Sequence, residues 1–74
     1  MKLRNVGSNQ TVVELANGDE VFFSYSTPVA AFISGTGYVR TDEFYSTTTS
    51  KHINKWTSRT DKVRPQSFFD NLVA

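Results

Sequence analysis

Hydrophobic and polar positions alternate in short runs over the first part of the chain. Four of these runs are rich in β-branched and aromatic residues and are separated by glycine, proline or small polar residues: 11–15, 20–25, 29–33 and 38–45. The pattern predicts an antiparallel meander of about four strands. Residues 2–6 leave two alternatives open, a short edge strand or a frayed beginning.

Asn17-Gly18 between two strand-like runs is a strong hairpin signal, because both residues tolerate the positive φ of a two-residue turn. Such a turn would pair Ala16 with Asp19. The pairing continues with Val13 opposite Phe22 and Val12 opposite Phe23, so one face would hold Val13, Leu15 and Phe22, and the other Val12, Val21, Phe23 and Tyr25.

Both faces of this hairpin are apolar, whereas an open antiparallel sheet usually has one solvated face. One interpretation is that helices cover one face while something else, such as a partner chain, covers the other. The alternative is a bulge that shifts the register. The two-sided hairpin also favours a homodimer.

The second part of the chain changes to a helical period. Hydroxyl residues are good helix caps and poor helix interiors, so the run Ser46–Ser50 predicts an N-cap between Thr47 and Ser50 and a helix over about 49–58. Ile53 and Trp56, with Thr49 one turn earlier, form its inward face. A last helix is expected over about 65–73, with Pro65 at its first position. Phe68, Leu72 and either Phe69 or Val73 would form its buried stripe.

Together these patterns predict a single α+β domain over residues 1–74. A small antiparallel meander of about four strands is followed by two C-terminal helices packed on one face. The expected core consists of the large apolar residues on the inward faces: Val13, Phe22, Phe32, Ile53, Trp56, Phe68 and Leu72.

The composition narrows the class of protein. Hydrophobic residues make up 38% of the 74 residues, which is enough for a globular core. There is no cysteine, so disulfides and thiolate metal sites are excluded and a reducing compartment is favoured. We expect no signal peptide and no membrane segment, because no long apolar run occurs.

The net charge of +1 conceals an uneven distribution. Residues 1–50 carry three Lys or Arg and five Asp or Glu, whereas residues 51–74 carry five and two. Lys51, Lys55 and Arg59 are spaced as one stripe on a helix and could hold phosphates. The competing interpretation is an ordinary solvated helix face.

Candidate chemistry gathers where the hydroxyl run meets the helix. Free N–H groups at a helix start, with hydroxyls and Lys51 and His52 nearby, suit an anion; the alternative is that the hydroxyls only cap the helix. His52 could be a general base or a ring hydrogen-bonded between sheet and helix. One histidine gives too few ligands for a metal. As a base His52 lacks an obvious nucleophile and an orienting carboxylate, other than Asp42 or Glu43 brought near by folding, so we expect no metal, no cofactor and no enzymatic activity.

The aromatic residues also allow two interpretations. Trp56 is predicted to be a core anchor, and its rival role is stacking on a nucleotide ring. Tyr25, Tyr38 and Tyr45 lie in the predicted sheet and could form an exposed patch suited to protein contact.

Three segments carry a resemblance to a known family: Ser24–Ala31 (SYSTPVAA), Tyr38–Thr41 (YVRT) and Tyr45–Trp56 (YSTTTSKHINKW). Over about residues 11–60 the chain resembles small single-domain proteins of tailed bacteriophages. The resemblance implies a phage accessory protein in the cytoplasm of the infected bacterial host, and it carries no catalytic role to this chain.

The leading hypothesis is a non-enzymatic protein that binds and modulates a host or anti-phage defence factor by protein contact. Its surface would be the exposed sheet face or the segment that begins the first helix. The alternative is a nucleic-acid or nucleotide binder that uses the helix start and the basic stripe. The candidate contact residues are Thr47, Thr48, Thr49, Ser50, Lys51, His52, Asn54, Lys55 and Arg59.

Overall fold

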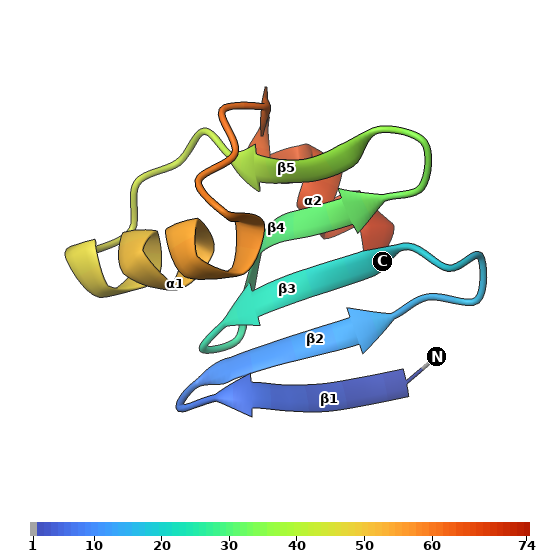
Figure 1. Ribbon diagram of the computed structural model, residues 1–74, viewed down its shortest axis with the longest axis horizontal. Coiled ribbons are helices and arrows are strands. Elements are labelled where there is room, and N and C mark those ends of the chain that lie inside the picture. Colours follow the sequence, from blue (N-terminus) through green and yellow to red (C-terminus); the bar gives the residue numbers. More distant parts are fainter. Residues whose placement is uncertain (1) are drawn as a thin grey trace.

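A computed structural model describes residues 2–74 as one sheet flanked by two helices (Figure 1). The strand order in the sheet follows the chain. The elements are β1 (Lys2–Gly7), β2 (Gln10–Glu14), β3 (Glu20–Ser24), β4 (Thr27–Ile33), β5 (Gly37–Thr41), α1 (Thr47–Thr57), β6 (Val63–Arg64) and α2 (Gln66–Leu72).

The α+β class is confirmed, but the sheet is larger than predicted and is mixed. Strands β1 to β5 form an antiparallel meander, and β6 adds to β5 in parallel. The two additional strands lie at the sheet edges. Residues 2–6 adopt the strand alternative, while β6 lies in a polar connector without a strand pattern. The predicted fourth strand ends at Thr41, so Phe44 and Tyr45 lie outside the sheet.

The predicted register of the first hairpin was wrong by one residue. Val12 lies opposite Phe22 and Val13 opposite Val21, because the loop contains three residues and not two. The Leu15 N–H donates to the Asp19 carbonyl, and Gly18 has a φ of 93°. A glycine of positive φ closing a three-residue loop is a common hairpin geometry. Since strand side chains alternate, the slip exchanges the predicted faces: Val12 and Phe22 share one face, and Val13, Val21 and Phe23 share the other.

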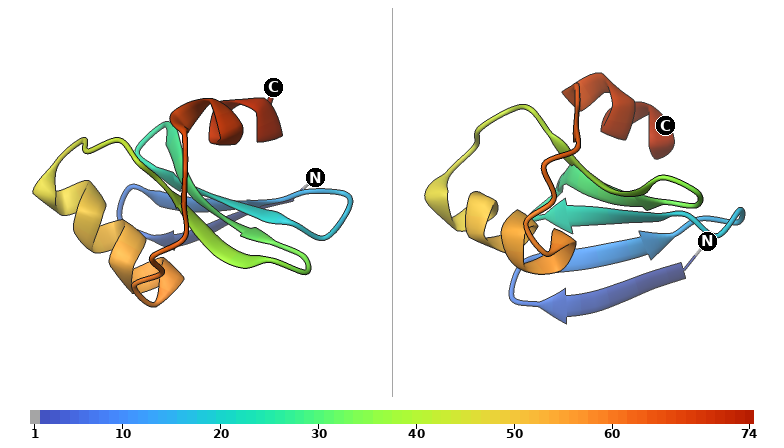
Figure 2. Two further views of the ribbon diagram at one scale, coloured as in Figure 1. Left: turned by 90° about the horizontal axis from the view of Figure 1, so that it is seen from above. Right: turned by 45° about the horizontal axis from the view of Figure 1, so that its top comes forward.

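The prediction that both helices pack on one face was also wrong, because α1 and α2 cover opposite faces of the sheet (Figure 2). After α1 the chain passes along the sheet edge as β6 and reaches the other face, where α2 begins. The second apolar face of β3 to β5 is therefore covered by the chain itself. A covering partner is not needed there.

Each face has its own hydrophobic cluster. The α1 side contains Val12, Phe22, Val29, Ala30 and Ile53, with Trp56 packed against them. The α2 side contains Ala31, Val39 and Phe69, with Ile33, Phe68 and Leu72 packed against them. Of the predicted core, Val13, Phe22 and Ile53 are buried, whereas Phe32, Trp56, Phe68 and Leu72 are only half-buried.

Candidate functional site

The N-cap of α1 is Ser46, one residue before the capping window predicted from the sequence. The Ser46 Oγ accepts the Thr49 N–H at 3.1 Å, which satisfies one of the free donors of the helix end. Thr49 is buried, and its hydroxyl lies 3.2 Å from both Ser46 Oγ and Ser24 Oγ. These hydroxyls therefore connect the helix start to β3.

His52 extends the same network. Its Nδ1 lies 3.0 Å from Ser24 Oγ, and Ser24 is only 2% exposed. A substrate cannot reach a hydroxyl buried to this degree, so the Ser24–His52 pair does not provide an accessible nucleophile. The geometry is that of a ring hydrogen-bonded between sheet and helix. No group of three side chains suited to a metal ion occurs within residues 2–74.

Asn54 and Arg59 also differ in role from the other predicted contact residues. The Arg40 Nη1 donates to the Asn54 Oδ1 at 2.7 Å, which joins β5 to α1. Arg59 does not continue the stripe of Lys51 and Lys55, because α1 ends at Thr57. Ser58 and Arg59 both have positive φ, 55° and 61°, and both donate their N–H to the Asn54 carbonyl.

The structure thus separates the predicted contact residues into two groups. Thr49, His52 and Asn54 are held by hydrogen bonds to the sheet, and Ser50 is half-buried. The exposed members are Thr47, Thr48, Lys51, Lys55 and Arg59. Lys51 and Lys55 remain neighbours on the outer side of α1.

Trp56 belongs to an aromatic cluster on the α1 side of the sheet. Its ring stacks on Phe22, with centroids 5.0 Å apart and an interplanar angle of 14°. Tyr38 meets it edge-on at 5.1 Å and 85°. These contacts engage the ring in packing, which is the geometry expected of a core anchor.

The three tyrosines do not form the exposed patch considered from the sequence. Tyr38 packs against Trp56 and Phe32 on the α1 side. Tyr45 follows the sheet, and its hydroxyl donates to the Gln66 Oε1 at 2.8 Å. Tyr25 alone lies beside the second surface that the fold creates.

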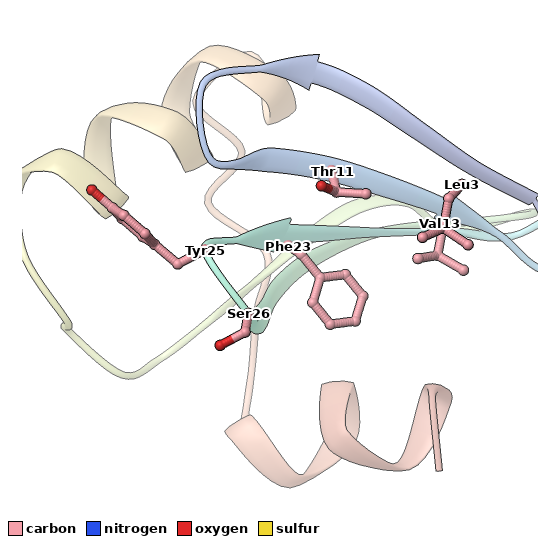
Figure 3. Close-up of a pocket in the computed structure, with 6 residues that line it drawn as sticks. All are labelled: Leu3, Thr11, Val13, Phe23, Tyr25 and Ser26. Atoms are coloured by element: carbon pink, nitrogen blue, oxygen red, sulfur yellow. The ribbon is translucent and has the colours of Figure 1, made fainter.

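That second surface is an open apolar groove of about 280 Å³ on the α2 side of the sheet (Figure 3). It extends from the β1 edge across β2 and β3 to the turn between β3 and β4. The described residues that line it are Leu3, Thr11, Val13, Phe23, Tyr25 and Ser26, and none of these six is charged. Leu3 is 70% exposed and Tyr25 56% exposed.

Tyr25 occupies an unusual backbone position at one end of this groove. Ser24 pairs with Thr27, so Tyr25 and Ser26 form a two-residue turn. Tyr25, the first of the two turn residues, has a φ of 59°. In a two-residue turn whose first residue alone has positive φ, that first residue is normally glycine. Its ring centroid lies 6.3 Å from that of His52. Tyr25 therefore lies at the end of the groove, with its ring directed toward α1 and away from Phe23 (Figure 3).

Sequence reasoning missed the groove because it depends on the corrected register. Leu3, Val13 and Phe23 share a face only when Val13 lies opposite Val21 and β1 joins the sheet. The available signal was the spacing from Ser24 to Thr27, which fits a two-residue turn with tyrosine at the glycine position.

The chain belongs to the family described as "Family of unknown function (DUF8033)", which matches residues 1–71. No curated protein and no solved structure matches it significantly. Across the part of the chain that the structure describes, no helix is long and apolar enough to cross a membrane.

Proposed function

We propose that this chain is a non-enzymatic protein-binding domain that contacts its partner through the groove on the α2 side of β1 to β3. The observation that carries the proposal is Tyr25. It is an exposed aromatic residue held at positive φ at one end of an apolar depression. Tyrosine is among the residues that most often dominate the binding energy of protein interfaces.

The backbone of Tyr25 supports a role outside folding. A non-glycine residue in a sparsely populated region costs on the order of 1–3 kcal/mol, and glycine would avoid that cost. Tyr25 as a whole is 56% exposed, so burial offsets little of that cost. A bulky side chain kept at such a position is consistent with a contact made to another molecule.

The surroundings of Tyr25 are also those of an interface. The groove lining is apolar apart from the hydroxyls of Thr11 and Ser26, and the Tyr25 ring extends from its end toward α1 (Figure 3). Interface centres are depleted in charged residues and enriched in aromatic ones. By contrast, most of the polar groups at the α1 start that would hold a phosphate are engaged within the chain.

The partner that we propose is a bacterial host protein or an anti-phage defence protein. The resemblance to small phage proteins over about residues 11–60 supports this choice, and we propose that the contact is made in the cytoplasm of the infected bacterium. In this proposal binding itself modulates the partner, without a chemical step.

The test compares two variants in a capture experiment on a bacterial lysate. Tyr25→Gly removes the ring, and the relief of the strained φ offsets the roughly 0.5–1 kcal/mol that glycine costs through unfolded-state entropy. Its stability should therefore equal or exceed that of the parent chain. The matched control is the double variant Lys51→Gln/Lys55→Gln, which alters two exposed residues on α1.

We expect a protein that is retained by the parent chain and by the lysine variant and is lost with Tyr25→Gly, as read by mass spectrometry. Thermal unfolding of each bait shows that the loss is not caused by misfolding. Equal retention by Tyr25→Gly, or loss in the lysine variant, would contradict the groove as the binding surface.

A further inference from the structure

A continuous apolar row crosses the sheet on the α2 side and stops at an open edge. The strand registers align Leu3, Val13, Val21, Ala31 and Val39 as successive neighbours on β1 to β5. The last four are at most 7% exposed, while Leu3 is 70% exposed. Within residues 2–74 the row therefore ends on β1, and no further strand extends it beyond Leu3.

The backbone of β1 also presents groups at this edge that pair with no other strand of the described residues. In β2 the odd-numbered residues bond toward β3, as the Leu15–Asp19 and Asn9–Tyr25 hydrogen bonds at its two ends show. Alternation along an antiparallel strand directs the N–H and C=O groups of Val12 and Glu14 toward β1. Their partners are Arg4 and Lys2, so the corresponding groups of Leu3 and Asn5 point away from the sheet.

Charge specifies what could pair with these groups. Lys2 and Arg4 flank Leu3 and lie on the opposite, α1-side face of β1. Arg4 has its own carboxylates, Glu14 at 3.3 Å and Glu20 at 3.8 Å. Glu14 lies on β2 and Glu20 on β3, so they are one and two strands away from β1, at a spacing of roughly 5 Å between neighbouring strands. The residues directly opposite an added strand are therefore the two cations.

We propose that the β1 edge binds an extended segment of the partner protein as an added strand. The segment would place an apolar residue opposite Leu3 and acidic residues opposite Lys2 and Arg4. Main-chain bonds to Leu3 and Asn5 supply affinity, and the alternating side chains supply specificity. This inference rests on the proposed function, because Leu3 belongs to both the edge and the groove.

A second copy of this chain fits the edge less well. Two-fold antiparallel pairing centred on Leu3 places Lys2 opposite Arg4 of the partner copy, and pairing centred on Arg4 places two arginines opposite each other. Like charges directly opposite are destabilising. Pairing centred on Asn5 avoids this opposition but puts Leu3 opposite Gly7, which has no side chain to extend the apolar row.

The probe for the test is a dye-labelled peptide of alternating glutamate and valine, titrated with the protein and followed by fluorescence anisotropy. A peptide of alternating lysine and valine is the charge control. We expect saturable binding of the acidic peptide only. Lys2→Glu should weaken that binding several-fold and favour the lysine peptide, without affecting the fold.

The edge itself is tested by Asn5→Pro with Asn5→Ala as its matched control. Both variants lose the bond from the Gly7 N–H to the Asn5 Oδ1, but only proline removes the outward N–H. Proline is tolerated on an edge strand when its N–H would face solvent. We expect Asn5→Pro to bind the acidic peptide roughly tenfold more weakly than Asn5→Ala, a difference of about 1.4 kcal/mol. Circular dichroism verifies that both are folded.

Equal binding by the two Asn5 variants, or no binding of the acidic peptide by the parent chain, would overturn the inference. So would a dimer seen by sedimentation that Asn5→Pro dissociates, because a second copy would then occupy the edge. Peptide binding that is lost in Tyr25→Gly and kept in Asn5→Pro would place the segment in the groove. In each of these cases a Tyr25-dependent capture from lysate would leave the proposed function standing.

Discussion

Gln66 shows how single side chains hold this small fold together. Its Nε2 donates to the Pro28 carbonyl at 2.7 Å and to the Asp70 Oδ1 at 3.1 Å. Its Oε1 accepts from Thr41 and Tyr45, each at 2.8 Å. Both donors and both lone pairs of the amide are therefore in use. One residue at the start of α2 connects that helix to β4, to β5 and to the segment before α1.

Tyr45 provides a pH-dependent test of this arrangement. Burial, followed by the charges of Glu43, Asp70 and Asp42, raises the pKa of the Tyr45 phenol above its usual value. A raised pKa in the folded state means that the protonated phenol stabilises the fold. Its contribution is complete below about pH 10, the usual tyrosine pKa, and is lost as the pH rises through the higher folded pKa.

We therefore expect stability to decline on alkaline titration by more in the parent chain than in Tyr45→Phe. The measurement is urea unfolding at a series of pH values, accompanied by the phenolate absorbance of the two proteins. A parallel decline in both proteins, or a Tyr45 phenolate that forms at the ordinary pH, would contradict the role of the hydroxyl.

At the scale of elements, α1 is defined by residues that sequence propensity ranks low for helix interiors. Ser46 caps its start, and Thr49 and Thr57 are buried within it. The Thr57 hydroxyl donates to the Ile53 carbonyl at 2.7 Å. Ser58 and Arg59 then end the helix in the left-handed region. The helix is stabilised by its contacts with the sheet more than by intrinsic propensity.

The N-cap gives a direct prediction for this element. Ser46→Ala removes the acceptor of the Thr49 N–H, and loss of such a cap costs about 1 kcal/mol. For a chain of this size we expect the Tm to fall by roughly 4–8 °C. Thr48→Ala, two residues away and exposed, is the matched control and should change stability by less than about 0.5 kcal/mol.

Thermal unfolding of the two variants checks this expectation. A neutral Ser46→Ala together with a destabilising Thr48→Ala would show that the helix begins nearer the window predicted from the sequence.

At the scale of the whole molecule, the layers place two kinds of surface at different sites. The outer side of α1 carries Lys51 and Lys55, and the apolar groove lies on the opposite face of the sheet, between the β1 edge and α2 (Figures 2 and 3). A nucleic-acid partner would use the first surface and a protein partner the second. The two functions are therefore separable by mutation.

Trp56 fluorescence tests the nucleic-acid alternative. The ring stacks on Phe22 under α1, close to the turn of helix that carries Lys51 and Lys55. We expect no saturable change on titration with single- or double-stranded DNA, RNA or nucleotides at low salt, and no mobility shift. A saturable signal that weakens with salt and disappears in Lys51→Gln/Lys55→Gln would instead assign phosphate binding to this helix.

The sequence by itself determined the local elements of this protein. Side-chain period, the Asn17-Gly18 loop and the hydroxyl run located most strands and both helices to within a few residues, because these signals depend on neighbours along the chain. Composition and period also indicated the α+β class. Most candidate contact residues lie in both the predicted and the observed helix, whereas Thr47 and Thr48 precede the predicted helix and Arg59 follows the observed one.

Only the tertiary structure decided how these elements combine. One extra residue in a hairpin loop exchanged the faces of β2 and β3, and a two-residue strand without any sequence signal, β6, carried the chain to the other face of the sheet. These choices depend on which arrangement buries both apolar faces at once, a property of all the elements together. They also opened the groove beside Tyr25, which is why the surface that we propose was not apparent from the sequence.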